Sequence, residues 1–289
     1  MSSSSSPSSS TSTRSSTTTP PLVGFFTYPN GLPDSRGRTL SEILSWGNDK
    51  LEYSHDYIQI VFPLPERSGV NWNAPLIDRA TFVAFRTQPA LRARLREAFE
   101  RMMAFYGFGI EEKKKKVAKS EDGDSGKGRT AVLTRLPEFE ERAGDSWLTR
   151  FDHNHLRITR IIRSLRVLGL ETEAKAFYEA LVDVVKERPG RVSGTSVMYW
   201  GRAMERPLNV KPDEDRVEEK AGPLFLREYE KGVLTELVKT SPSHVNVASS
   251  SEDKGSPTQD TTAKVEEPNP DSREEAPSNS TDMQRSKSP

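Results

Sequence analysis

Apolar side chains recur every three or four residues through most of the stretch between Leu40 and Lys186, and this spacing constrains the fold more than any other feature. The clearest case is residues 89–106, where one stripe holds Leu91, Leu95, Phe99, Met102, Met103 and Tyr106. Side chains at such steps share one face of an α-helix, so the stretch predicts a helix that buries this face. Gly107 follows where a helix C-terminus favours a left-handed residue.

The same spacing predicts several further helices. They are expected to begin at Thr39 and Asp78 and to cover residues 49–62, 154–168, 171–186 and 196–204, with 224–238 as a last helix. Gly169 separates two of them by a short connection, which predicts an antiparallel helical pair. No stretch shows a convincing alternation of apolar and polar residues, since 131–133 is too short to count as a strand. We therefore expect an all-α fold, a compact multi-helix domain.

The two ends of the chain have a different composition from its middle. Residues 1–21 are nearly all Ser, Thr and Pro, and residues 239–289 are rich in Ser, Pro and acidic residues. Such segments bury too little apolar area to offset chain entropy, so we expect disordered tails around a domain at 22–238. Residues 111–129 mix charges with Gly and Ser, which predicts a flexible charged loop within that domain.

Several classes of protein are disfavoured by composition. The chain has no cysteine, which excludes disulfides, thiolate metal sites and a catalytic cysteine. No apolar run approaches the roughly 20 residues that cross a bilayer, and the N-terminus has no apolar stretch typical of a secretory signal. We expect a cytoplasmic or nuclear protein whose contact with membranes, if any, is peripheral.

Arginines at every third position are the most unusual feature of the expected helix at 154–168. Arg157, Arg160 and Arg163, with His153 and His155 near the helix start, form a candidate anion-binding surface, because guanidinium groups bind oxyanions in bidentate fashion. The alternative is that the arginines pair with acidic residues such as those at 171, 173 and 179, or extend to water.

Two further groups are candidate ligand-binding residues. His55 precedes Gln59 by four positions, so the two can hydrogen-bond on one helix face. In the segment 68–73, Asn71 supports a fixed turn, while Trp72 either packs into the core, which we favour, or lines a groove. We expect no metal, since the histidines near 153 would need ligands from elsewhere, and no cofactor.

Three segments together resemble the opioid growth factor receptor family. The first lies in 25–75 and has matching positions at Trp46, His55, Tyr57, Ile58, Gln59, Phe62, Pro63, Ser68, Gly69 and Asn71. The second is the helix ending MMAFYGFGI at 102–110, and the third is NHLRITRIIRSLRVLGL at 154–170, followed by Tyr199 and Trp200. The C-terminal peptide repeats of some animal members do not occur in this sequence.

The resemblance implies a receptor that binds an enkephalin-type peptide, associates with the nuclear envelope, enters the nucleus and restrains proliferation. We accordingly expect a non-catalytic protein with a peptide or protein ligand; the sequence does not determine an oligomeric state. One alternative is a hydrolase or phosphate-handling enzyme that uses His55 or the group of His153, His155 and Arg157. A second is nucleic-acid binding through arginine-rich helices, which acidic residues among the arginines of 89–106 make unlikely.

These alternatives predict different sites. An enzyme requires a closed polar pocket in which His55 or His155 meets carboxylates. A binding protein requires an open groove with exposed aromatic side chains. Nucleic-acid binding requires a continuous positive face.

Overall fold

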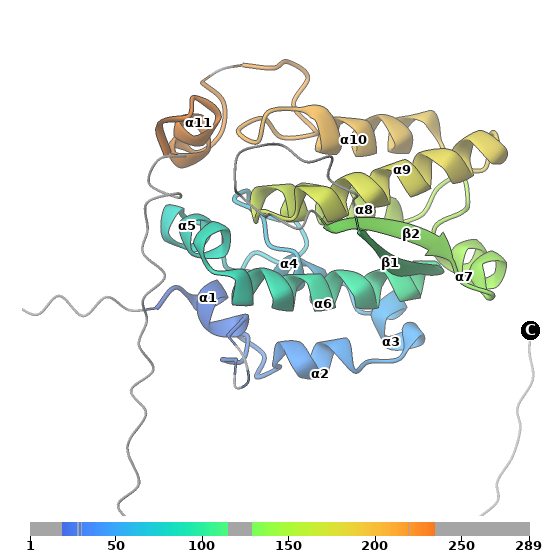
Figure 1. Ribbon diagram of the computed structural model, residues 1–289, viewed down its shortest axis with the longest axis horizontal. Helices are drawn as coiled ribbons and strands as arrows, with labels where there is room; N and C mark the ends of the chain where they lie inside the picture. The colour runs from blue at the N-terminus through green and yellow to red at the C-terminus, as the bar shows by residue number, and fades with distance from the viewer. Residues whose placement is uncertain (1–18, 28, 30, 115–128, 219, 235–289) are drawn as a thin grey trace, which may run out of the picture. The chain divides into compact units, whose positions relative to one another are not determined.

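A computed structural model describes residues 19–27, 29, 31–114, 129–218 and 220–234, which form a mainly helical unit (Figure 1). The prediction of a predominantly helical domain is confirmed. In chain order the helices are α1 (Pro21–Phe25), α2 (Leu40–Leu44), α3 (Asn48–Tyr53), α4 (Ile58–Val61), α5 (Arg79–Thr87), α6 (Pro89–Tyr106), α7 (Phe139–Ser146), α8 (Asn154–Val167), α9 (Glu171–Glu187), α10 (Gly194–Glu205) and α11 (Leu224–Glu230).

The ends of several helices are set by the residues that the sequence indicates. The side chain of Thr39 accepts a hydrogen bond from the backbone N–H of Glu42 at the start of α2, and Asp78 does the same for Thr81 at the start of α5. Gly107 ends α6 with φ 92°, a left-handed conformation that costs glycine little.

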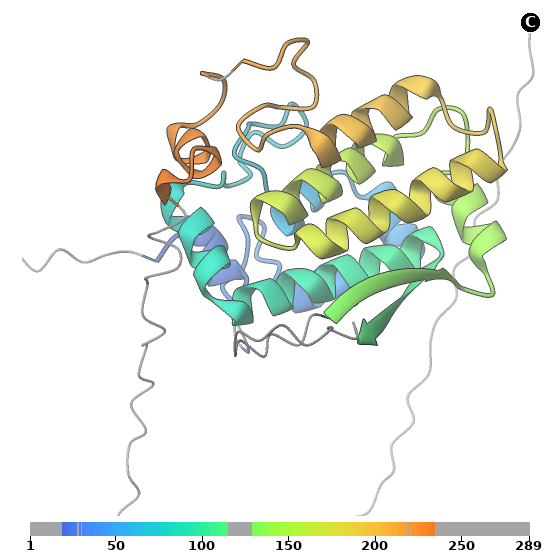
Figure 2. The ribbon, with the colours of Figure 1, turned by 45° about the horizontal axis from the view of Figure 1, so that its top comes forward.

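The core lies where α6 meets the later helices. The predicted stripe of α6 is buried throughout, and α8, α9 and α10 pack on one another (Figure 2). Gly169 has φ 88° and connects α8 to α9, as the sequence predicts. The buried apolar face of α8 comprises Ile158, Ile161, Ile162, Leu165 and Val167. In Figure 1, α1, α2 and α3 lie on one side of α6 and α8–α10 lie on the other.

A two-stranded antiparallel sheet corrects the prediction that the chain has no strand. β1 (Phe108–Lys114) pairs with β2 (Arg129–Arg135) in a register that places Phe108 opposite Arg135 and Lys114 opposite Arg129. Only a few side chains of this sheet enter the core, and charged residues occupy many of its other positions. The two strands therefore lack the alternation of apolar and polar residues by which a strand is recognised in a sequence. The predicted loop at 111–129 is therefore wrong at both ends, and residues 115–128 lie outside the described residues.

A break between α3 and α4 corrects the prediction of one continuous helix over 49–62. The side chain of Arg157 on α8 donates to the carbonyl oxygens of Leu51, Glu52 and Ser54. In a continuous helix, each of these carbonyl oxygens would accept a hydrogen bond from the backbone N–H four residues later. The tertiary contact therefore replaces the helical hydrogen bonds, while Leu51 and Ile58 both remain buried.

The predicted tails and domain limits remain predictions, since residues 1–18 and 235–289 lie outside the described part. α1 begins at Pro21, the last residue assigned to the first tail, and α11 covers the first half of the expected last helix. Within the described residues, no helix has the length and apolar character needed to span a membrane.

Candidate functional site

Arg157, a predicted ligand residue, is engaged within the protein. Its guanidinium donates to the carbonyl oxygens of Leu51, Glu52 and Ser54 at 2.9, 2.9 and 2.8 Å, and to Asn154 Oδ1 at 3.1 Å. Because these carbonyls belong to the end of α3 and the residues after it, Arg157 joins that end to α8. Its side chain is buried and acts as a structural tie.

Arg163 is also engaged within the protein. It pairs with the carboxylate of Glu66 and donates to the backbone carbonyl oxygens of Leu208 and Val210 at 3.1 and 3.0 Å. Only 2% of the residue is exposed. The acidic partner therefore comes from the segment after α4, whereas Glu171 and Glu173 pair with Arg86 and Arg96.

Arg160 differs from its two neighbours on α8. Within the described part of the chain, its one hydrogen bond runs from a guanidinium nitrogen to the carbonyl oxygen of Phe62, at 3.2 Å. A guanidinium has five N–H donors, so most of its donor capacity remains free for another group. Burial lowers the pKa of Arg160 to about 10, and the nearby carboxylate of Glu66 offsets part of this effect. The side chain remains cationic at neutral pH.

Gln59 on α4 carries a buried polar atom without a partner. The residue is 5% exposed, and its Oε1 has no hydrogen-bond partner among the described residues. Exchanging the oxygen and nitrogen of the amide still leaves a polar atom at this buried position. Such a group costs stability, so its presence calls for an explanation.

A cavity of about 590 Å³ brings Gln59 and Arg160 to one site, which we name the α8 cavity. Its walls come from α4, the segment 64–70, α8, Tyr199 of α10 and residues 211–213. The lining is mostly apolar, and it includes Ile58, Leu64, Val70, Leu156 and Tyr199. Two of these side chains extend into solvent, with Val70 66% and Leu156 72% exposed.

His155 lies outside the cavity and inside the core. Its Nε2 lies 2.8 Å from the carbonyl oxygen of Trp147, and its Nδ1 lies 2.9 Å from Ser196 Oγ. Because a carbonyl oxygen only accepts, Nε2 carries the proton and Nδ1 accepts from the Ser196 hydroxyl. The buried ring therefore links α8 to the first turn of α10, and the structure does not bring it together with the predicted ligand residues that line the cavity.

His55 and His153 both line the α8 cavity, with ring centroids 5.2 Å apart. His55 precedes α4, so it does not share a helix face with Gln59 as predicted; its Nδ1 lies 3.4 Å from a guanidinium nitrogen of Arg157. The histidine that meets carboxylates is His153, the one the enzyme alternative did not single out for this role.

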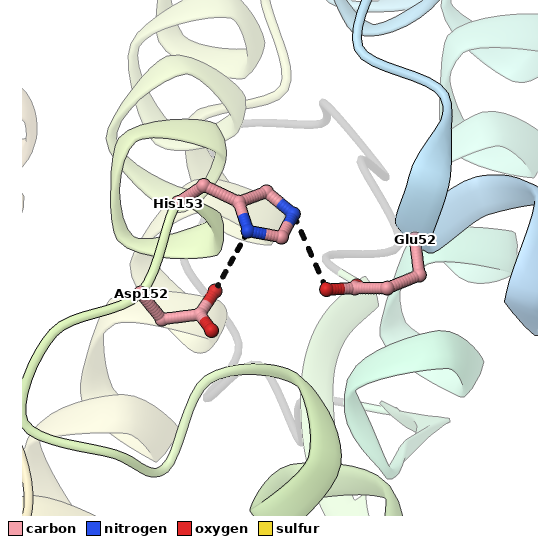
Figure 3. Close-up of side chains that lie close together, drawn as sticks. All are labelled: Glu52, Asp152 and His153. Carbon is pink, nitrogen blue, oxygen red and sulfur yellow. Dashed lines mark ion pairs between the residues drawn. The ribbon is translucent and has the colours of Figure 1, made fainter. Parts of the chain in front are cut away.

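Figure 3 shows His153 between Glu52 and Asp152, with one carboxylate facing each ring nitrogen. Nε2 lies 3.3 Å from Glu52 Oε1, and Nδ1 lies 3.5 Å from Asp152 Oδ1. These groups are close enough to be considered as metal ligands. A metal bound to imidazole occupies one nitrogen only, whereas Glu52 and Asp152 face different ring nitrogens, so the placement does not suit a single metal ion.

The predicted residues of the 68–73 turn divide between two roles. Ser68 and Gly69 line the α8 cavity, whereas Asn71 and Trp72 do not. Asn71 Nδ2 donates to the carbonyl oxygen of Asp56 at 3.0 Å and so holds the segment against the start of α4. Trp72 is 67% exposed, which makes the favoured prediction of a core residue wrong. Trp46, Trp147 and Trp200 are buried.

The comparison with known families gives a direct match. The model of the conserved region of the opioid growth factor receptor matches residues 37–207, more than half of the chain. The chain belongs to the opioid growth factor receptor family. All but the last three residues that line the α8 cavity, 211–213, lie within the conserved region.

Curated relatives of the opioid growth factor receptor family agree with this assignment. The opioid growth factor receptor of Rattus norvegicus is 38% identical over 138 residues, which are 47% of this chain and 21% of the relative. The human receptor is 36% identical over 124 residues, 43% of this chain and 16% of the relative. Opioid growth factor receptor-like protein 1 of Xenopus tropicalis is 33% identical over 148 residues, which are 50% of this chain and 25% of the relative. The match thus spans a quarter or less of each of these relatives. No solved structure matches the chain significantly.

The arginines of α6 in this opioid growth factor receptor family member are held by intramolecular partners. Arg92 donates to the carbonyl oxygens of Phe85 and Arg86, and Arg101 donates to the carbonyl oxygen of Trp46. Arg94 and Arg96 pair with acidic side chains. These contacts disfavour a continuous positive face on α6, and with it the nucleic-acid alternative.

Sequence reasoning missed several residues of the cavity. Glu66 gave no signal, because its partner Arg163 is far away in the chain and only the fold brings them together. Val70 belongs to the turn that the sequence singled out, and Tyr199 to a family-matching pair, so either could have been included. Leu156 could have been noticed as an apolar residue that lies off the buried stripe of α8.

Proposed function

We propose that this opioid growth factor receptor family member is a non-catalytic, receptor-like protein and that the α8 cavity is its binding site for a peptide or protein ligand. The observation that carries the proposal is a mostly apolar cavity of about 590 Å³ whose wall includes Arg160, a guanidinium with one hydrogen bond among the described residues. A ligand group that accepts hydrogen bonds there uses donors that the protein leaves free.

The shape and lining of the cavity support binding over catalysis. Exposed Val70 and Leu156 beside the cavity offer apolar contact to a ligand that extends into solvent. A general base in a hydrolase must reach its substrate, so His155, which is buried with both ring nitrogens engaged, is not a candidate for this role; His55 and His153 do line the cavity. The cytoplasmic or nuclear location that the resemblance implies, including association with the nuclear envelope, is part of the same proposal.

A peptide selection with a blocked cavity tests the proposal. A display library of short random peptides is selected on the wild-type protein, and enriched peptides are then measured on Gly69→Trp. Gly69 lines the cavity, and a Cβ added there has no atom within 4 Å, so a side chain can begin there without a clash at its first atom. We expect binding to be weaker by roughly tenfold or more, since blocking a central contact costs above 1.4 kcal/mol.

Gly194→Trp is the matched control. Gly194 opens α10, has equally open space around an added Cβ and does not line the cavity. Peptides that bind at the cavity should bind this variant as they bind the wild type. Failure to enrich any peptide, or enriched peptides that bind Gly69→Trp at full strength, would show that the α8 cavity is not a peptide-binding site.

A further inference from the structure

We infer that the face of α5 that α11 covers is a docking surface for an amphipathic helix of a partner protein, and that α11 fills this surface in the free chain. α11 lies beside α5 in both views of the molecule (Figure 1, Figure 2). α5 belongs to the matched region 37–207, whereas α11 follows that region. Neither helix lines the α8 cavity, so this inference does not depend on the proposed function.

Aromatic side chains anchor α11 to α5. Phe225 and Tyr229 are four positions apart and therefore share one face of α11. Their ring centroids lie 5.3 and 5.2 Å from that of Phe82, and Leu226 beside them is completely buried. A guanidinium nitrogen of Arg86 donates to Tyr229 Oη at 2.6 Å. Apolar anchors at such spacing are the means by which an amphipathic helix binds the surface of another protein.

Charged and polar contacts flank these anchors. Arg79 at the start of α5 pairs with Glu228 at 3.5 Å. Glu230 Oε1 accepts a hydrogen bond from the backbone N–H of Leu208 at 2.6 Å. The surface thus offers α11 a cation and two hydrogen-bond donors, and complementary charge favours one partner and one orientation over others. The partner helix that fits has two aromatic or large apolar side chains four positions apart, with acidic side chains beside them.

The fit of α11 to this surface is incomplete. The Nε of Arg227 and the Oε2 of Glu228 are buried and have no hydrogen-bond partner among the described residues, although Oε2 keeps the ion pair with Arg79. Such atoms lower the stability of the docked helix, and a helix of seven residues has little stability of its own. α11 still fills the surface, because attachment to the same chain gives it a high effective concentration. A partner helix without these unsatisfied groups binds with higher intrinsic affinity and displaces α11.

The test uses the full chain with α11 released and the sequence of α11 as the probe. Phe225→Ala combined with Tyr229→Ala removes both aromatic anchors from the tethered helix. A fluorescent peptide with the sequence of residues 223–234 is titrated with this double variant and with the wild type, and binding is followed by fluorescence anisotropy. We expect the peptide to bind the double variant roughly tenfold or more tightly, since a surface filled for about nine-tenths of the time weakens apparent binding about tenfold.

Two matched variants and a selection test the chemistry of the partner. Leu224→Ala changes a residue of α11 that is 60% exposed, so this variant should bind the peptide as weakly as the wild type does. Arg79→Glu, added to the double variant, should weaken binding by up to roughly fivefold and leave a Glu228→Gln peptide almost unaffected. A peptide library selected on the double variant should enrich sequences that repeat the anchor spacing and displace the probe. Enriched peptides without this spacing overturn the description of the partner.

The remaining outcomes decide against the inference. Failure of the peptide to bind a folded double variant overturns it, because α11 is then an ordinary part of the core. If the double variant no longer unfolds cooperatively in urea, Tyr229→Phe takes its place, since it removes only the hydrogen bond from Arg86. Tyr229→Phe should bind the peptide roughly fivefold or more tightly than the wild type does, and equal binding overturns the inference. A wild-type chain that sediments as a dimer, and as a monomer once both anchors are replaced, assigns the surface to a second copy instead.

Discussion

Replacing Gln59 by leucine should stabilise the protein. The side chain is almost fully buried, and Oε1 is inaccessible to water and unpartnered within the described residues. A buried polar group without a partner costs about 1–3 kcal/mol relative to an apolar group of similar shape. Leucine keeps most of the volume, so little of this gain should be lost to a new void.

The net effect should be an increase of about 1–2 kcal/mol in the free energy of unfolding, allowing for imperfect packing of the new side chain. Urea unfolding followed by circular dichroism measures this quantity. With a slope of about 1–3 kcal/mol per molar urea, the midpoint should rise by roughly 0.5–1 M at an unchanged slope.

Ser164→Ala is the matched control for this prediction. Ser164 Oγ is also buried without a hydrogen-bond partner in the described part, but the residue does not line the α8 cavity. Alanine should also stabilise the protein, because it too removes a buried polar atom that has no partner in the described part. A lower unfolding free energy for Gln59→Leu would refute the reasoning, because it would show that the amide has a partner that stabilises the fold.

Three further predictions concern charged and titrating groups. Arg157→Met should lower the free energy of unfolding by about 3–5 kcal/mol, because buried acceptors lose their donor, whereas Arg160→Met should cost under about 1.5 kcal/mol; urea titration compares the two. Burial raises the pKa of Asp34, but hydrogen bonds from Arg38 and from backbone N–H groups bring it below its ordinary value. A depressed carboxyl pKa contributes its full stabilisation of the folded state above the unfolded pKa of about 3.9, and the contribution is lost as the pH falls through the folded pKa. Asp34→Asn should therefore have a lower free energy of unfolding than the wild type at neutral pH, and the same free energy of unfolding below the folded pKa. Burial raises the pKa of Tyr57 to about 12, so stability should fall as pH rises above about 10, where the unfolded chain loses the proton first; phenolate absorbance of wild type and Tyr57→Phe checks this.

The helices could be predicted where local sequence decides them. α6 has the bounds that its apolar stripe and Gly107 predict, and α8 and α9 differ from prediction by one residue at one end. In these segments, side-chain spacing and the terminal glycine agree with the tertiary packing. Local information was therefore sufficient for most of the helical unit.

Prediction failed where a distant partner decides the local structure. The break between α3 and α4 depends on Arg157, which lies about a hundred positions later and takes the carbonyl oxygens of the expected helix. The hairpin depends on pairing between β1 and β2, strands whose charged residues conceal their alternation. Neither partner can be identified from the residues on one side of the contact.

The candidate site shows the same limit in a sharper form. Arginines at 157, 160 and 163 look equivalent in the sequence, yet the fold uses the first to cap α3 and the third to bind Glu66. Only Arg160 retains most of its donors, and only because Phe62 is its single acceptor in the described part. The donors that can serve a ligand are therefore those that intramolecular hydrogen bonds leave unused.

Gln59 extends this reasoning from donors to acceptors. Around it, Tyr57, Ile58 and Phe62 are buried and apolar in their contacts, so a leucine at 59 would satisfy the packing of α4 at least as well. A polar atom in that position lowers the stability of the unliganded protein, and a fold with no ligand gains nothing from it. Gln59 and Arg160 both line the α8 cavity, so the fold keeps an unpaired amide oxygen and a guanidinium with free donors in one region of the molecule.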